Sequence, residues 1–130
     1  MSDDPLADLL LDASQVDRAR LASALQGILG VDTETGRVVF KPGYGRLTTR
    51  HRVLAYLLGR KAAVLLGKAE EEAATPKEIC IDTGMPSGTV NPKLRELGRA
   101  RLVSQTDVSE YYVAAHQLTQ ALQDLSEQRE

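Results

Sequence analysis

A run of side chains suited to nucleic-acid contact lies between Gly88 and Arg99. Val90, Leu94 and Leu97 are spaced i, i+4 and i+7, which predicts a helix with one apolar stripe. The opposite face carries Gly88, Pro92, Arg95 and Arg99, flanked by Thr89, Asn91 and Lys93. Small residues allow close approach, asparagine can pair with an adenine edge, and arginine can bind guanine or phosphate. The pattern favours a groove-binding helix, and an ordinary solvated helix face is the alternative.

Pro92 lies inside this helical pattern, where proline removes a backbone donor. If Ser87 or Gly88 caps the helix, Pro92 is its fourth or fifth residue, at the edge of the turn whose donors lack intrahelical partners. The proline then costs at most about one hydrogen bond, of order 1 kcal/mol. We therefore expect one continuous helix over about residues 87–99.

A second cationic cluster occurs in "GYGRLTTRHR", where Arg46, Arg50 and Arg52 surround the expected start of another helix. The helix dipole disfavours cations at this end by about 0.3 to 1 kcal/mol each. A phosphate bound to these side chains and the free amides of the first turn would reverse the penalty. Tyr44 or the two glycines would allow close approach, and Lys77 could also contact backbone. The alternative is a crowded but solvated basic loop.

Residues for catalysis or metal binding are not grouped in this sequence. His51, His116 and Cys80 have no metal-ligand spacing, and Cys80 between two isoleucines is expected to be a small core hydrophobe. No P-loop, dinucleotide fingerprint, nucleophile elbow or HExxH motif is present, and "KPGYGR" is only a glycine-rich loop. We therefore expect no enzyme activity, no cofactor and no metal.

The net charge of -2 conceals a segregation of charge along the chain. Residues 35–69 contain eight basic residues and no acidic one, whereas residues 1–34 contain seven acidic residues and two basic ones. A basic middle between acidic ends predicts a polyanion-facing surface, the alternative being bases on solvated helix faces. No apolar run approaches the roughly 18 to 20 residues of a membrane span, and the acidic N-terminus does not resemble a signal peptide. A cytoplasmic protein is expected.

The expected elements are mostly helices, with two short β-structures between them. Their approximate ranges are helix 5–13, helix 14–29, strand or hairpin 31–41, loop 41–47, helix 49–66, helix 76–83, helix 87–99, hairpin 102–115 and helix 118–125. Thr75, Pro76 and Glu78 predict the start of helix 76–83, with Ile79 and Ile81 buried. The acidic run at 70–72 is expected to be a solvated connector.

The expected order is a longer helix, two short helices joined by a glycine-containing turn, and a hairpin. The two short helices and their turn are typical of a helix-turn-helix motif. The stretch "TPKEICIDTGMPSGTVNPKLRELGRARLVSQ" resembles the winged helix-turn-helix superfamily of bacterial and archaeal DNA-binding proteins, over about residues 47–125. The family's spacing from the recognition helix into the first wing strand is kept by "TV" at 89 and 90, Leu94, Leu97 and "LV" at 102 and 103. Two departures are Arg101, where the family usually has glycine, and the short acidic wing "DVSE", where minor-groove wings commonly carry Arg or Lys.

The resemblance implies a mainly α fold with a small β-hairpin, in the α+β class. Residues 1–46 would form an N-terminal helical extension with a short strand and loop. Residues 47–130 would form the winged helix-turn-helix domain with its C-terminal helix, and the two parts would make one compact unit.

The resemblance also implies sequence-specific binding of double-stranded DNA, with the helix at 87–99 in the major groove, by a homodimeric transcriptional regulator. The candidate DNA-binding residues are Arg46, Arg50, Arg52, Lys77, Ser87, Thr89, Asn91, Lys93, Arg95 and Arg99. A winged-helix module for protein–protein interaction or assembly, without specific DNA binding, is the alternative.

A homodimer is expected because several apolar faces have no obvious place in a winged-helix core. These faces are Leu9 to Leu11, the set Leu21, Leu25 and Ile28, and the stripe Leu118, Leu122 and Leu125. Pairing across a two-fold axis would place two recognition helices about 34 to 36 Å apart and predict a palindromic operator. The alternative is that the same faces complete the core of the monomer.

Overall fold

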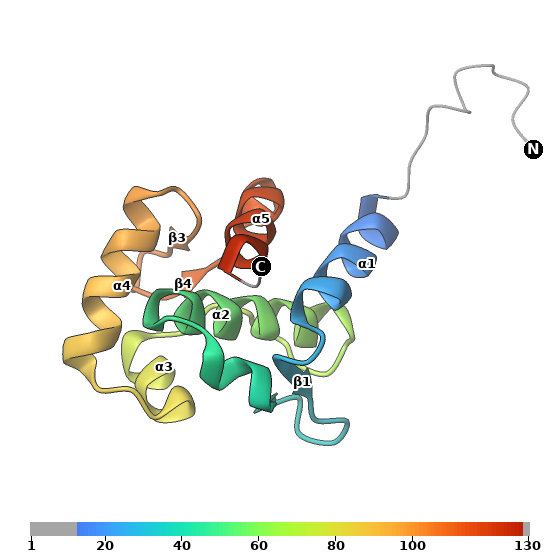
Figure 1. Ribbon diagram of the computed structural model, residues 1–130, viewed down its shortest axis with the longest axis horizontal. Coiled ribbons are helices and arrows are strands. Elements are labelled where there is room, and N and C mark those ends of the chain that lie inside the picture. The colour runs from blue at the N-terminus through green and yellow to red at the C-terminus, as the bar shows by residue number, and fades with distance from the viewer. Residues whose placement is uncertain (1–12, 129–130) are drawn as a thin grey trace, which may run out of the picture.

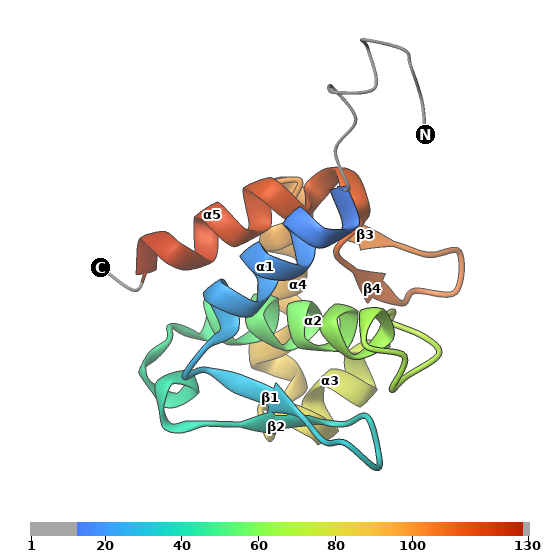
Figure 2. The ribbon, with the colours of Figure 1, turned by 90° about the vertical axis from the view of Figure 1, so that its right-hand side faces the viewer.

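Helix α2 (Thr49–Leu65) is the central element of the structure, a computed structural model that describes residues 13–128. It contacts each of the other four described helices. Figures 1 and 2 show α1 and α5 on one side of α2 and the strands β1 and β2 on the other. Six consecutive residues of α2, numbers 53–58, are fully buried. A helix that is surrounded on all sides has no face left for solvent, so its middle is apolar or neutral throughout.

The other elements are short and follow one another with brief connections. In chain order they are α1 (Ala13–Leu25), β1 (Leu29–Val31), β2 (Val38–Phe40), the 3-10 helix η2 (Pro42–Arg46), α3 (Pro76–Thr83), α4 (Ser87–Arg99), β3 (Ser104–Gln105), β4 (Tyr111–Tyr112), the 3-10 helix η3 (Ala115–Gln117) and α5 (Leu118–Gln128). Strands β1 and β2 form one antiparallel pair and β3 and β4 form another. The described residues thus form a mainly helical fold with small antiparallel hairpins, which confirms the expected α+β class.

Helices α2 and α3 begin and end where their capping residues predict. The Thr48 hydroxyl accepts a hydrogen bond from the His51 amide at the start of α2. Thr75 and Glu78 form a capping box at the start of α3, and Gly84 ends that helix in the left-handed conformation, with φ of 76°. These signals are local, so the sequence alone locates both helices.

The first described helix is shorter than expected. It ends at Leu25, and Gly27 turns the chain with φ of 80°, so Leu29 and Gly30 lie in β1 rather than in a helix. Leu29 pairs with Phe40 in the hairpin. The expectation of a helix to residue 29 was wrong. The turn at Gly27 places Ile28 and Leu29 in the core, so these two apolar residues fit the helical spacing although they follow the helix. The helix expected at 5–13 lies outside the described residues, apart from Ala13.

The segment expected to be a loop, "KPGYGRL", forms η2 instead. Pro42 stands in its first turn, where a missing amide donor costs little. The Gly43 amide donates a hydrogen bond of 3.0 Å to the Gly27 carbonyl. A Cβ atom at position 43 would lie 2.4 Å from that carbonyl oxygen, so only glycine lets these two chain segments cross.

Two details of α3 and α4 also differ from expectation. Ile79 is fully buried, but Ile81 is 69% exposed, because residues two apart on a helix point in nearly opposite directions. The N-cap of α4 is Pro86 rather than Ser87 or Gly88, so Pro92 is the sixth helical residue. Proline there removes the usual donor to the Gly88 carbonyl. Gly88 is exposed, so water can replace that donor and α4 continues unbroken.

The apolar faces of α1 and α5 pack together inside the monomer. Leu21, Leu25 and Ile28 belong to the same buried cluster as the stripe of α5, and none of these leucines and isoleucines is more than 5% exposed. The alternative left open by the sequence, that these faces complete the core of the monomer, is therefore what the structure shows for them. Leu9 to Leu11 lie outside the described residues. No described helix is long and apolar enough to cross a membrane.

Candidate nucleic-acid interface

Helix α4 lies at the end of the molecule far from α1 (Figure 1). Its stripe of Val90, Leu94 and Leu97 is at most 1% exposed, and the helix packs on α2 and α3. The residues expected to point outward are all exposed, namely Gly88, Pro92, Arg95 and Arg99. The helical periodicity therefore gave the correct orientation of α4.

Arg95 and Arg99 are the free cations of this face. Among the described residues, none forms a hydrogen bond or an ion pair with either guanidinium group. Ser87 is exposed at the start of α4, about two turns before Arg95, whereas Thr89 and Asn91 are half-buried. Because both guanidinium groups are unpaired within the described chain, they can bind phosphate or guanine without first breaking a contact there.

Arg101 occupies the position before β3 where the family resemblance implies a glycine. It ends α4 in the left-handed conformation, with φ of 61°, where glycine is usually found. The Leu102 amide donates to the Leu97 carbonyl and the Arg101 amide to the Gly98 carbonyl, each at 3.0 Å. This is a Schellman motif with an arginine in place of glycine. It adds a further exposed cation after Arg99 that sequence reasoning treated only as a departure.

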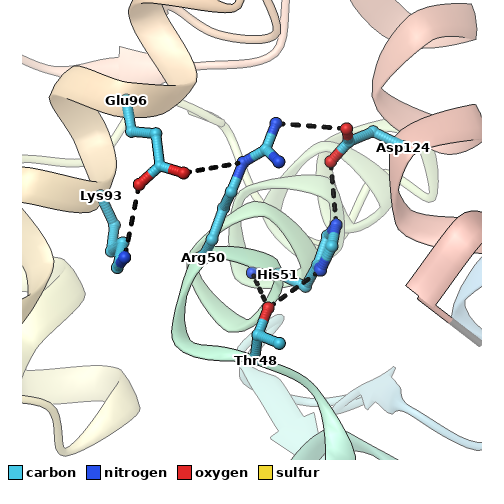
Figure 3. Close-up of polar contacts among 6 residues, drawn as sticks. All are labelled: Thr48, Arg50, His51, Lys93, Glu96 and Asp124. Carbon is cyan, nitrogen blue, oxygen red and sulfur yellow. Dashed lines mark hydrogen bonds and ion pairs between the residues drawn. The ribbon is translucent and has the colours of Figure 1, made fainter.

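Arg50 is held within the protein rather than free at the start of α2 (Figure 3). Its Nη2 atom lies 3.2 Å from Asp124 Oδ1, and its Nε atom lies 3.7 Å from Glu96 Oε1. Lys93 lies on the other side of Glu96, with 3.3 Å between its Nζ and Glu96 Oε2. Arg50 thus joins the start of α2 to both α4 and α5, and Lys93 shares the same carboxylate.

His51 belongs to the same polar cluster, although the sequence assigned it no role. Its Nε2 lies 2.9 Å from Asp124 Oδ2, and its Nδ1 lies 3.0 Å from the Thr48 hydroxyl (Figure 3). The imidazole therefore links the cap of α2 to α5. His51 and Asp124 are 73 positions apart, so no local pattern could reveal the pair.

Arg52, which was also expected to bind phosphate, forms contacts within the protein as well. Arg52 Nη2 donates to the Gly45 carbonyl at 2.6 Å, and its guanidinium carbon lies 5.9 Å from the Tyr44 ring centroid. Tyr44 is only 8% exposed and packs on Phe40, and burial raises its pKa to about 12. Arg46 is exposed, as is Lys77 on α3, and neither side chain is paired with any described residue. Of the three arginines expected near this helix start, only Arg46 is therefore available to a ligand.

The acidic connector after α2 is anchored, contrary to the expectation that it is merely solvated. Arg60 donates to the carbonyls of Glu72 and Ala73, at 3.0 and 2.9 Å. Lys61 is buried, and its Nζ lies 3.1 Å from Glu72 Oε1 and 3.0 Å from the Val113 carbonyl. Like Arg50 and Arg52, the basic residues Arg60 and Lys61 therefore form contacts within the protein. The charge run at 35–69 is therefore not one continuous polyanion-facing surface.

The ion pair of Lys61 and Glu72 gives a stability prediction. Glu72→Ala is expected to lower the free energy of unfolding by about 2 to 3 kcal/mol, because it leaves a buried ammonium group with one carbonyl partner. Urea denaturation measures the loss. Glu71→Ala is the matched control, since that side chain is exposed, and it should change stability by less than about 0.5 kcal/mol. Equal losses in the two variants would show that the pair contributes nothing.

The hairpin formed by β3 and β4 carries no cation at its tip. Asp107 and Val108 are exposed there, Val108 by 70%, and Ser109 turns the chain with φ of 61°. The Thr106 amide donates to the Glu110 carbonyl and closes the turn at 2.8 Å. The tip thus lacks the positively charged side chains that the negative potential of a narrow minor groove attracts.

Residues 13–128 contain no group of three or more histidine, cysteine, aspartate and glutamate residues placed to hold a metal ion. Cys80 is half-buried and packs against the core. No family model, no curated protein and no solved structure matches this chain.

Proposed function

We propose that this protein binds double-stranded DNA through the outward face of α4, as a winged helix-turn-helix regulator of transcription. The order of α2, α3, α4 and the β3–β4 hairpin, with only residues 84–86 between α3 and α4, supports this fold assignment. The observation that carries the proposal is the pair of exposed guanidinium groups of Arg95 and Arg99, which no residue in 13–128 pairs with, opposite the buried stripe of α4.

In this proposal the two ends of α4 do different work. The first turns, with Ser87, Thr89 and Asn91, contact base edges, as the N-terminal residues of a recognition helix do. Arg95 and Arg99 bind phosphate or guanine further along. Lys77 on α3 and Arg46 before α2 add phosphate contacts that fix orientation without reading sequence.

Glu96 is the one acidic residue on α4, and it is compatible with DNA contact. Its carboxylate is 48% exposed but lies between Arg50 and Lys93, which offset its charge. A carboxylate in a major groove can also accept a hydrogen bond from the cytosine amino group. Glu96 therefore need not repel the duplex.

A homodimer on a palindromic operator belongs to the same proposal. The leucines of α1 and α5 that the structure describes are buried in the monomer, so they are not free to form its interface. The dimer would therefore use another surface of the protein. Sedimentation with and without operator DNA measures the oligomeric state, and a duplex bound by one copy alone would exclude the palindrome.

A protein-docking module is the second candidate, and the wing favours it. Val108 is a 70% exposed apolar residue at a tip that carries Asp107 and no cation. Such a tip fits a protein surface better than a phosphate backbone. Binding that persists at high salt to a protein, with no duplex affinity, would support this candidate in place of the first.

The salt dependence of duplex binding tests the proposal. A duplex is first selected from a random library with the wild-type chain, and its affinity is then measured at several salt concentrations. Four phosphate contacts per bound copy, from Arg46, Lys77, Arg95 and Arg99, predict a slope of about -3.6 per copy for log affinity against log salt, or about a 100-fold loss per copy between 50 and 200 mM. A chain that selects no duplex, or whose binding ignores salt, contradicts the proposal.

A further inference from the structure

A cavity of about 420 Å³ lies between α1, β1 and the C-terminal end of α2, at the opposite end of α2 from Arg50. Its walls are mainly apolar and include Leu21, Leu25, Leu29, Val31, Ala62 and Leu65. Cavities of 300 to 1,000 Å³ with apolar walls and few polar groups are the usual size and character of small-molecule sites. None of the contacts proposed for DNA involves this region.

Small residues at three facing positions keep this cavity open. Ala22 comes from α1, Gly30 from β1 and Ala62 from α2. A Cβ atom at Gly30 would meet only the end of the Lys41 side chain, with Cε 3.6 Å away. The backbone therefore leaves room that larger side chains at these positions would fill.

The charged residues that line the cavity are all cationic within the described chain. Lys41 and Arg18 line it, and no acidic residue does. Arg18 donates a hydrogen bond to the Leu65 carbonyl near the end of α2, which holds its guanidinium at the wall. Lys41 is exposed, its ammonium lies next to Gly30, and no described residue pairs with it. An ammonium without a partner beside an apolar wall is suited to a ligand with an apolar body and one anionic end.

We propose that this cavity binds a small amphipathic carboxylate. The apolar body lies against the leucines of α1, β1 and α2, and the carboxylate forms a charge-assisted hydrogen bond with Lys41. The proposal does not depend on DNA binding, because neither the cavity nor Lys41 belongs to the face of α4.

Octanoate is the probe, and calorimetric titration of the full-length chain is the measurement. Octanoate is expected to bind saturably at one site, with octan-1-ol, the uncharged probe of the same chain length, binding at least 10-fold more weakly. Lys41→Gln is expected to weaken octanoate binding about 10-fold, the usual size of a charge-assisted hydrogen bond. Lys68→Gln is the charge-matched control on an exposed lysine outside the cavity, and it should leave binding unchanged.

A second variant tests whether octanoate binds inside the cavity or only to positive charge on the surface. Ala22→Phe fills the cavity from an exposed position of α1, so it should abolish octanoate binding while the circular dichroism spectrum stays that of the wild type. Equal binding of octanoate and octan-1-ol, or unchanged binding in Ala22→Phe, overturns the proposal. It is also overturned if octanoate binds only after Leu9, Leu10 and Leu11 are changed to serine, because the chain's own N-terminal segment is then the occupant.

Discussion

The double variant Arg95→Ala/Arg99→Ala is expected to bind its selected duplex at least about 30-fold more weakly than the wild type and to fold normally. Each well-placed arginine contact contributes about 1 to 3 kcal/mol, so two together account for a factor of this size. Both side chains are exposed and have no partner among the described residues, so their loss should change stability by less than about 0.5 kcal/mol. Fluorescence anisotropy with labelled duplex measures the affinity.

A matched control removes the same charge from another part of the surface. Arg37 and Lys68 are exposed and lie outside α3, α4 and η2, so the Arg37→Ala/Lys68→Ala variant should lose far less affinity at the same net charge. Similar losses in the two double variants would mean that only overall charge matters, and α4 would lose its assignment as the recognition helix.

Leu94→Ala is expected to lower the free energy of unfolding by about 2 to 5 kcal/mol, the range for removing a buried leucine. Leu94 is 1% exposed and belongs to the stripe by which α4 packs on α2 and α3. Truncation removes apolar contacts and leaves a space that the helices can only partly close. For a domain of this size, such a loss is a large fraction of the total stability.

Chemical denaturation of Leu94→Ala is compared with that of Arg95→Ala, the next residue along α4. The arginine variant should be nearly as stable as the wild type because its side chain is exposed. A small loss in Leu94→Ala, or equal losses in the two, would contradict the orientation of α4 on which the proposed interface depends.

The elements of the chain that could be predicted are those whose signals are local. Thr48, Thr75, Glu78 and Gly84 act within a turn or two of the helix ends that they define, and the structure places those ends as expected. The stripe of α4 likewise needs only its own spacing. The end of α1 failed this test because Gly27 makes a turn that returns the next apolar residues to the same core.

The availability of the basic residues could not be predicted, because it depends on partners that are distant in sequence. Arg50 and Asp124 are 74 positions apart, and Lys61 reaches the Val113 carbonyl across 52 positions. Composition shows that a segment is basic but not which of its cations are already paired. The structure therefore narrows the set of basic residues that could bind DNA. On α4 it leaves Arg95 and Arg99 without a partner among the described residues.

Titration of the wild-type, isotope-labelled chain with its selected duplex, followed by amide chemical shifts in NMR spectra, tests the DNA-binding face most directly. The largest changes are expected in α4, over Ser87–Arg99, with smaller changes around Arg46 and Lys77. Changes confined to the wing at 106–110, or absent from α4, would contradict the proposal that the outward face of this helix contacts DNA.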